Sequence, residues 1–254
     1  MNRSTEDRIF GFNPIEAALQ SGKRTIDRIW ILSGRSSSRA GHIKALARER
    51  GILVEEIDPQ RLTRLAGGIP RAAHQGVIAA VSALPYAEPE EILARCTAVS
   101  RLLVAEGVED PRNLGALIRT AAASGATGLF IPRRGSAGLT GTVAKTAAGA
   151  AEILPVARIG NVTSFINLLK EQKFWTIGLD VRSDRPWDRT EYPDRVAIVV
   201  GGEGSGLRRL ARETCDETVS IPVAAGVESL NVSVAAGVCL YEALRQHRGR
   251  KIGG

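Results

Sequence analysis

The chain of 254 residues has few cysteines and no long uninterrupted apolar run. Its three cysteines, Cys96, Cys215 and Cys239, are far apart and odd in number, which argues against a disulfide framework. We therefore expect free thiols in a reducing compartment. The beginning of the chain, MNRSTEDRIF, is charged rather than apolar, so neither a secretory signal nor a membrane-spanning segment is expected, and the predicted location is the cytoplasm.

Motifs for metals and for nucleotide phosphates are also missing. The three histidines, His42, His74 and His247, are scattered, and the cysteines lack ligand spacing, so no metal site is predicted. The glycine-rich segment VVGGEGSGL lacks the lysine of a P-loop. Its glycines follow the spacing GxGxG, which differs from the GxGxxG of dinucleotide-binding loops.

The composition is that of a globular protein, and its charge is unevenly distributed. Hydrophobic residues make up 44% and charged residues 24% of the chain, with a net charge of +7. Residues 1–84 hold 13 Lys or Arg against 8 Asp or Glu, giving +5, whereas residues 85–254 hold 21 against 19, giving +2. This distribution indicates a polyanionic partner that the first third of the chain contacts.

Apolar periodicity predicts two α/β domains. In residues 1–84, helical patterns at 13–20, at 41–50 and after Pro59 alternate with strand patterns at 26–32, 52–57 and 77–84. The segment LPYAEPEE is typical of a linker, which we place at residues 85–97.

Residues 98–254 form the second predicted domain, in which strand and helix patterns alternate. This alternation predicts a mostly parallel sheet covered by helices on both faces. The expected strands lie at residues 101–106, 128–131, 152–156, 175–179, 196–200 and 218–222.

The first motif that carries possible chemistry is GVEDPRNLGALIRTAAASGA, residues 107–126. Asp110 or Asn113 is suited to cap a helix that begins near Pro111, and an apolar stripe follows at helical spacing. Arg119 lies off that stripe, six residues after Asn113. Taken alone, this motif is best interpreted as a capped helix with a solvated arginine.

The second motif, VVGGEGSGLRRL at residues 199–210, places consecutive glycines between a strand and a helix. Such a loop exposes backbone groups for close approach of a ligand. Glu203 puts negative charge inside the loop, which disfavours phosphate and favours a cationic or neutral ligand. A tight structural turn explains these residues equally well.

The third motif, at residues 219–246, places SLN at the beginning of a long helix. Ser229 or Asn231 is suited to cap this helix, whose first turns are rich in alanine and glycine. Apolar residues then recur at helical spacing, namely Val234, Val238, Tyr241 and Leu244. Small residues permit close packing, so we expect contact with another element or with a second subunit.

Together these three segments resemble the SpoU, or TrmH-like, family of RNA 2′-O-methyltransferases in the SPOUT class. The resemblance rests on the order and spacing of N-x5-R, GGEGxGL and SLNVSVAxG, and on GFNPIEAAL and HQGVIAAVS at the ends of the first third. It implies an α/β fold in which a C-terminal trefoil knot follows a small L30e/L7Ae-like RNA-binding domain. The most similar branch methylates a guanosine of 23S rRNA.

The resemblance also implies roles for particular residues. Arg119 corresponds to the catalytic arginine and Asn113 to its positioning residue, while Glu203, Ser229 and Asn231 complete the active site. The cofactor implied is S-adenosylmethionine. Its expected binding residues, which act largely through backbone groups, are Gly201, Gly202, Gly204, Ile221, Leu230 and Asn231.

Several alternatives remain open at this point. Because arginine is almost always protonated, Arg119 is either an electrostatic stabiliser of the 2′-oxygen or an unusual general base. The RNA is 23S rRNA, free or in a large-subunit assembly intermediate, or else a tRNA. A non-catalytic RNA-binding or ribosome-assembly factor is the alternative outside the enzymes. A homodimer is expected from the resemblance.

Overall fold

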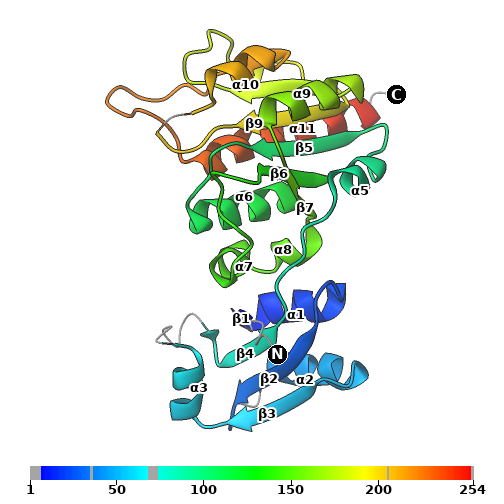
Figure 1. Cartoon of the computed structure of the whole chain (residues 1–254), viewed down its shortest axis with the longest axis vertical. Coiled ribbons are helices and arrows are strands. Elements are labelled where there is room, and N and C mark those ends of the chain that lie inside the picture. The colour runs from blue at the N-terminus through cyan, green and yellow to red at the C-terminus, as the bar shows by residue number, and fades with distance from the viewer. Residues whose placement is uncertain (1–6, 35–36, 68–73, 205, 253–254) are drawn as a thin grey trace. The chain divides into compact units, whose positions relative to one another are not determined.

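The computed structural model of the chain describes residues 7–34, 37–67, 74–204 and 206–252 (Figure 1). Contacts divide the chain into two compact units. The first consists of Met1–Pro85 and Leu139–Ile153, and the second of Tyr86–Gly138 and Leu154–Gly254. The first unit therefore includes a segment that lies far from its other residues in sequence.

The first unit is built on a mixed sheet with strand order β1-β4-β2-β3. Its strands are β1 (Asp7–Phe10), β2 (Ile26–Leu32), β3 (Leu53–Ile57) and β4 (Val77–Val81). Strand β4 runs antiparallel to both of its neighbours, and β2 pairs with β3 in parallel. Among the described residues of this part of the chain, the helices with stated bounds are α1 (Phe12–Ser21), α2 (Ser38–Glu49) and α3 (Pro59–Leu65). The sequence patterns predicted β2, β3 and β4, but they did not predict the short strand β1.

The inserted segment contributes α7 (Gly141–Ala147) and α8 (Ala150–Ile153), which pack against β1 and α1. The predicted strand at residues 152–156 is wrong at its beginning, because residues 150–153 are helical and the strand starts at Val156. The physical reason is tertiary. Glu152 is buried and forms an ion pair with the equally buried Arg24, which follows α1. This pairing and the packing of α8 on α1 override the local preference for a strand.

The second unit confirms the predicted parallel sheet, with strand order β10-β8-β9-β5-β6-β7. All of its pairings are parallel. The strands are β5 (Ser100–Ala105), β6 (Gly128–Pro132), β7 (Val156–Ile159), β8 (Trp175–Leu179), β9 (Arg195–Val200) and β10 (Glu217–Val219). The predicted strand at 218–222 is thus shorter than expected, because the chain leaves the sheet after Val219.

Helices cover both faces of this sheet (Figure 1). Residues of α5 (Pro89–Ala94), α9 (Val162–Glu171) and α10 (Arg209–Thr214) share one apolar core with the sheet. Helix α6 (Pro111–Ala123) and helix α11 (Val232–Ile252) pack against each other and contact β6 and β9 respectively. A short 3-10 helix, η1 (Trp187–Arg189), precedes β9. Among the described helices, none combines the length and the apolar character needed to cross a membrane.

The segment in which the sequence predicts a linker carries regular structure. Ala87 bridges to Ala157 beside the sheet, and α5 follows with Ile92 completely buried in the apolar core. Residues 86–97 therefore contribute to the second unit as well as connecting the two parts of the sequence.

The C-terminal half of α11 is held by buried polar contacts. His247 is 3% exposed, and its Nδ1 accepts a hydrogen bond from Arg101 at 2.8 Å. Its Nε2 then donates to the carbonyl oxygen of Pro193 at 2.8 Å, so the ring is neutral. Burial lowers the pKa of His247, in agreement with this arrangement.

Candidate active site

Two loops interlock at the carboxyl ends of the central strands. Because β5 and β9 are parallel neighbours with Ala105 opposite Val200, the residues that follow each strand emerge side by side. Gly107 and Gly202 then approach so closely that a Cβ added at Gly202 would lie 2.0 Å from the carbonyl oxygen of Gly107. The glycine-rich loop also folds on itself, and the N–H of Gly206 donates to the carbonyl oxygen of Gly202 at 3.1 Å. The glycines are therefore required by backbone packing.

Three polar side chains from distant parts of the second unit meet beside these loops. Asn113 Nδ2 donates a hydrogen bond to Glu203 Oε1. Asn231 Nδ2 donates to Asn113 Oδ1 at 2.9 Å and to Glu203 Oε1 at 3.3 Å. We call these three residues the amide–carboxylate cluster. It joins one residue from each of the three motifs that sequence analysis selected.

The helices on which the cluster rests begin at defined caps. Asp110, the residue before α6, accepts the backbone N–H of Arg112 at 2.9 Å. Asn231 Oδ1 accepts the backbone N–H of Ser233 at 3.0 Å at the beginning of α11. Of the open alternatives, Asp110 and Asn231 are thus the caps. Asn113, in the first turn of α6, contacts Glu203 instead.

The pocket next to the cluster has an acidic wall. It encloses about 400 Å³ and is lined by Gly107, Val108, Glu109, Asp110 and Glu203. Three of these five residues are acidic. Such a wall attracts a positively charged group and repels phosphate, in agreement with the ligand preference inferred from Glu203 in the sequence.

Arg119 and Ser229 lie outside the cluster. Arg119 is exposed on α6, away from the buried stripe of that helix, as predicted. The rise of an α-helix places it about 9 Å along the axis from Asn113. Ser229 is exposed in the loop before α11. Among the described residues, neither side chain makes a hydrogen bond or an ion pair with the cluster.

The predicted cofactor-binding residues occupy two loops at the same edge of the sheet. Gly201 and Gly202 are half-buried and buried respectively, while Gly204 is exposed with a φ of 80°. Ile221 and Leu230 lie in the loop between β10 and α11, where Leu230 is 36% exposed. Leu230 directly precedes the cluster residue Asn231 in this loop.

The buried face of α11 differs from the apolar repeat seen in the sequence. Ala236, Cys239, Leu240 and Ala243 are completely buried, whereas Val234 is 51% and Tyr241 48% exposed. A Cβ added at Gly237 would lie 3.0 Å from Thr120 on α6, so α6 and α11 pack closely. Small residues therefore make the contact with α6, whereas Val234 and Tyr241 stay about half exposed.

The chain matches two known protein families. Residues 100–241 match the SpoU rRNA Methylase family, and residues 8–87 match the RNA 2'-O ribose methyltransferase substrate binding family. The chain belongs to the SpoU rRNA methylase family. This membership confirms the resemblance inferred from the three motifs.

The relatives of this SpoU protein cover almost its whole length. It is 41% identical to the 23S rRNA (guanosine-2'-O-)-methyltransferase RlmB of Ralstonia nicotianae, over 94% of this chain and 95% of that protein. A solved RNA 2'-O ribose methyltransferase is 27% identical with a TM-score of 0.81, covering 97% of this chain and 91% of the other. The AviRb methyltransferase of Streptomyces viridochromogenes, solved in complex with AdoMet, has the same fold, with a TM-score of 0.79. It is 24% identical, and the match covers 97% of this chain and 92% of AviRb.

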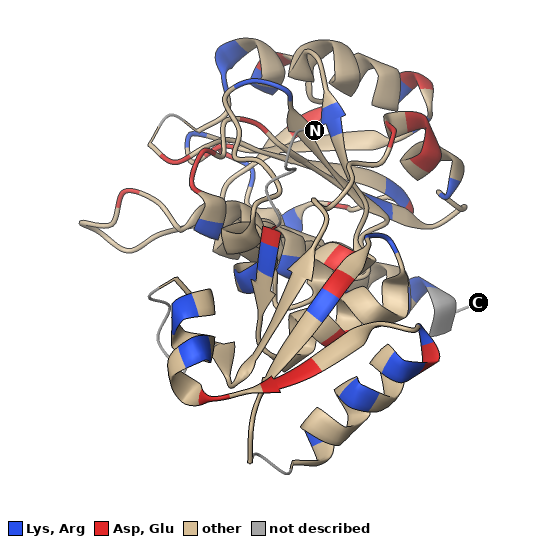
Figure 2. Ribbon diagram, turned by 60° about the horizontal axis from the view of Figure 1, so that its bottom comes forward, with Lys and Arg blue, Asp and Glu red and all other residues tan. Residues whose placement is uncertain are grey.

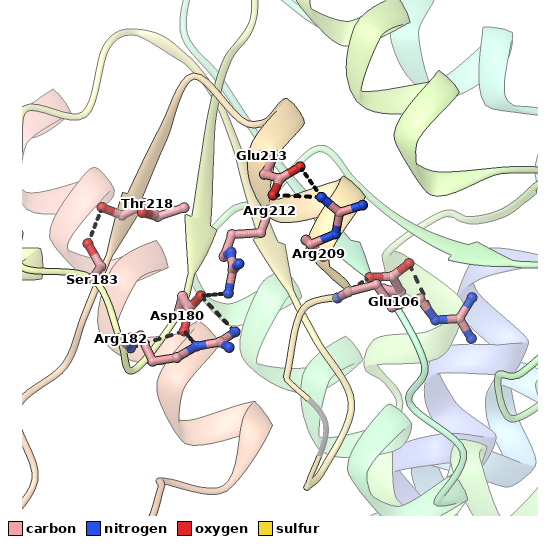
Figure 3. A network of polar contacts seen from close by, with 9 residues as sticks. Glu106, Asp180, Arg182, Ser183, Arg209, Arg212, Glu213 and Thr218 are labelled. Atoms are coloured by element: carbon pink, nitrogen blue, oxygen red, sulfur yellow. Dashed lines mark hydrogen bonds and ion pairs between the residues drawn. The ribbon is translucent and has the colours of Figure 1, made fainter.

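Two buried carboxylates, which the sequence patterns did not predict, hold the loops of this SpoU domain in place. Glu106, which ends the apolar run RLLVAE, is 6% exposed and accepts the backbone N–H of Arg208 at 3.1 Å, where the glycine-rich loop enters α10. Asp180 follows β8 and binds Arg182 and Arg212, whose guanidinium nitrogens donate at 3.0 to 3.1 Å (Figure 3). In both places, an acidic residue directly after an apolar strand was the available signal.

The arginines around Asp180 determine its charge state. Burial by itself would raise the pKa of Asp180, but the hydrogen bonds from the Arg182 side chain and backbone and from Arg212 outweigh it and hold this pKa below its usual value. The carboxylate therefore remains charged near neutral pH. It fixes the loop after β8 to α10.

None of the three cysteines belongs to the amide–carboxylate cluster or lines the pocket beside it. All three are free, as predicted. Burial raises the pKa of Cys215 to about 12 and that of Cys239 to about 11, so neither thiol is a nucleophile near neutral pH. In the described ranges, no group of three or more His, Cys, Asp or Glu side chains is arranged to hold a metal ion.

Proposed function

We propose that this protein transfers a methyl group from S-adenosylmethionine to the ribose 2′-hydroxyl of a guanosine in 23S rRNA. The amide–carboxylate cluster of Asn113, Glu203 and Asn231 is the observation that carries the proposal, because it joins the three family motifs at one edge of the sheet. The similarity to a protein named for this reaction, along 94% of the chain, supports the choice of RNA and of nucleotide.

The residues at this edge fit a sulfonium cofactor. When bound, S-adenosylmethionine supplies a methyl group on a positively charged sulfur, and the acidic wall formed with Glu203 is suited to that charge. The residues proposed to hold the cofactor are Gly201, Gly202, Gly204, Ile221, Leu230 and Asn231. Their loops expose backbone groups, and a cofactor without phosphates avoids repulsion by the carboxylates.

Arg119 is proposed to act on the acceptor oxygen. A ribose hydroxyl is a weak nucleophile, and negative charge develops on its oxygen as the methyl group is transferred. The guanidinium of an exposed arginine remains protonated, so Arg119 stabilises this charge and orients the oxygen. Asn113, held by Glu203 and Asn231, positions the acceptor, and Ser229 completes the site from the loop before α11. Holding the reacting atoms in line supplies much of the acceleration.

The decisive experiment is transfer of a radiolabelled methyl group into RNA, followed by digestion to identify the nucleotide. We expect label on the 2′-oxygen of one guanosine of 23S rRNA. Replacing Arg119 by Ala should lower single-turnover transfer by about 100-fold or more, while cofactor affinity is unchanged. Arg119→Lys, which retains the charge, should recover part of the rate.

Other outcomes of this experiment would contradict the proposal. Label confined to tRNA would identify a tRNA ribose methyltransferase instead. RNA binding without any transfer would indicate a non-catalytic assembly factor. Near-normal transfer by Arg119→Ala, with cofactor binding intact, would exclude both proposed roles of this arginine.

The first unit is proposed to bind the RNA. Lys and Arg residues lie along α2 and α3 (Figure 2). Among them, Arg48 and Arg64 are exposed in the last turns of these two helices. These cations are suited to contact the phosphate backbone. The match of residues 8–87 to a substrate-binding family supports this assignment. A ribosomal substrate also supports the predicted cytoplasmic location.

A homodimer is proposed on the exposed apolar face of α11. Val234 and Tyr241 are seven residues apart and therefore lie on one side of the helix, where each is about half exposed. Burying this face against a second copy would remove apolar surface from water. Sedimentation or light scattering should give the mass of a dimer, and Val234→Asp should give a folded monomer. The trefoil knot implied by the family stays a prediction.

A further inference from the structure

The loop that follows β6 lies against the acidic wall of the pocket. Strands β5 and β6 are parallel neighbours, so residues 133–138 emerge beside residues 106–110. The backbone N–H of Ala137 donates to the carbonyl oxygen of Val108 at 2.9 Å. A Cβ added at Gly135 would lie 3.8 Å from Glu109 Oε1. This loop therefore forms part of the rim around the pocket.

The same loop is anchored at both ends. The backbone N–H of Arg133 donates to the carbonyl oxygen of Ile159 at 2.9 Å, which continues the sheet pairing beyond β6. At the other end, a Cβ added at Gly138 would contact the Arg158 guanidinium at 3.5 Å. Arg158 in turn donates to the hydroxyl of Tyr86 at 3.0 Å and lies over its ring. The backbone of this loop is thus fixed near both of its ends.

Arg133 and Arg134 are the two side chains at the exposed turn of this loop. Both are exposed, and neither forms a hydrogen bond or an ion pair with any described residue. Most arginines around Asp180 and Glu106 are paired with carboxylates, so these two differ in having their charge available.

Binding of RNA next to the acidic pocket requires positive charge on the protein. Each ribose is flanked by phosphates, and the pocket wall of Glu109, Asp110 and Glu203 repels them. Cations on the rim would offset this repulsion and leave the acidic wall for the cofactor. Arg133 and Arg134 are suited to this task because guanidinium groups bind phosphate with directed hydrogen bonds.

We propose that Arg133 and Arg134 form a clamp that binds the phosphates next to the target ribose. This inference rests on the proposed function, since it assigns the substrate contacts of the same site. The clamp acts on the RNA and does not touch the cofactor. Its removal therefore lowers the affinity for RNA and leaves the affinity for S-adenosylmethionine unchanged.

The test compares two charge-matched double variants. Arg133→Gln with Arg134→Gln removes the clamp. Arg95→Gln with Arg248→Gln removes the same charge near the amino ends of the strands, from two exposed arginines. RNA affinity is measured against salt concentration with a 23S rRNA fragment, and S-adenosylmethionine affinity is measured by calorimetry. Removing the clamp should reduce the slope of log K against log salt by about 1 to 2, because each lost phosphate contact contributes about 0.7 to 0.9.

Each outcome decides for or against the clamp. A reduced slope for the clamp variant, an unchanged slope for the matched control, and a restored slope for Arg133→Lys with Arg134→Lys would support it. Equal slopes for the clamp variant and the wild type would overturn it, as would an equal reduction in the matched control. Because these are binding measurements, they stay informative even if the wild type transfers no methyl group, which would refute the proposed function alone.

Discussion

Replacing Gly202 by alanine should separate the two loops on which the candidate site is built. The φ of Gly202 lies outside the left-handed region, so the effect is steric and not conformational. A Cβ at this position would lie 2.0 Å from the carbonyl oxygen of Gly107 and 2.7 Å from its carbon. Ordinary contact between such atoms is about 3.5 Å. The two backbones would therefore have to move apart by roughly 1.5 Å, and no rotamer change can relieve the overlap.

The expected cost follows from the neighbours that must move. Overpacking a buried position costs about 1 to 3 kcal/mol, and a clash between backbone atoms belongs at the upper end. For a chain of this size, that corresponds to a fall in the midpoint of thermal unfolding of roughly 2 to 12 °C. Gly107 also lines the pocket with Glu203, so the affinity for S-adenosylmethionine should fall as well.

Gly249→Ala is the matched control for this experiment. A Cβ at Gly249 would meet no atom within 4 Å, and the residue is exposed within α11. This substitution should stabilise the protein by about 0.5 to 1 kcal/mol, since alanine restricts the unfolded chain and favours the helix. Thermal unfolding followed by circular dichroism, together with calorimetric titration of the cofactor, measures both effects. An unchanged midpoint and an unchanged affinity for Gly202→Ala would refute the close approach of the two loops.

Three further predictions concern contacts away from these glycines. Because burial lowers the pKa of His247 from 6.5, the unfolded chain binds a proton that the folded chain does not, and the free energy of unfolding should fall as the pH decreases below about 6.5. In urea titrations at several pH values, His247→Gln should weaken this pH dependence. Equal pH dependence of the variant and the wild type would contradict the neutral, buried state of His247. Glu152→Ala leaves Arg24 buried without its partner and should cost about 3 to 5 kcal/mol in denaturant unfolding, whereas replacing both residues by Leu and Met should cost less. Asn231→Ala should remove the cap of α11, lower the free energy of unfolding by about 1 kcal/mol and abolish methyl transfer. Asn231→Ser should retain most of the stability and still lose methyl transfer, because a serine keeps the cap but not the amide contacts. Full activity of the serine variant would count against the cluster.

Much of the second unit could be predicted because the hydrophobic pattern of its strands and helices agrees with their burial in the fold. The buried strands β5, β6, β8 and β9 are apolar runs of the expected length, and β9 has all but its first residue buried. The buried stripe of α6 follows the predicted helical spacing, which also left Arg119 exposed. In these elements the residue pattern and the tertiary environment favour the same structure.

Predictions were wrong or incomplete where distant contacts outweigh local preference. Residues 150–153 form a helix because Glu152 pairs with Arg24, which lies 128 residues earlier. The apolar repeat of α11 did not indicate which side is buried: Val234 and Tyr241 are about half exposed, and small residues make the contact with α6. Hydrophobic spacing locates the faces of a helix, but it does not say which neighbour covers each face.

The sequence by itself determined the chemistry available to this protein: the three motifs, the acidic glycine-rich loop, the surplus of basic residues in the first third, and hence the SpoU family. It did so because turns, caps and apolar periods are local properties of neighbouring residues. Only the tertiary structure decided that Asn113, Glu203 and Asn231 form one cluster, although 118 residues separate the first from the last. The structure also decided that Gly107 packs against Gly202 and that the loop of residues 133–138 lies against Val108 and Glu109. These arrangements depend on which parallel strands are neighbours, and neighbouring strands are chosen by the packing of the whole sheet.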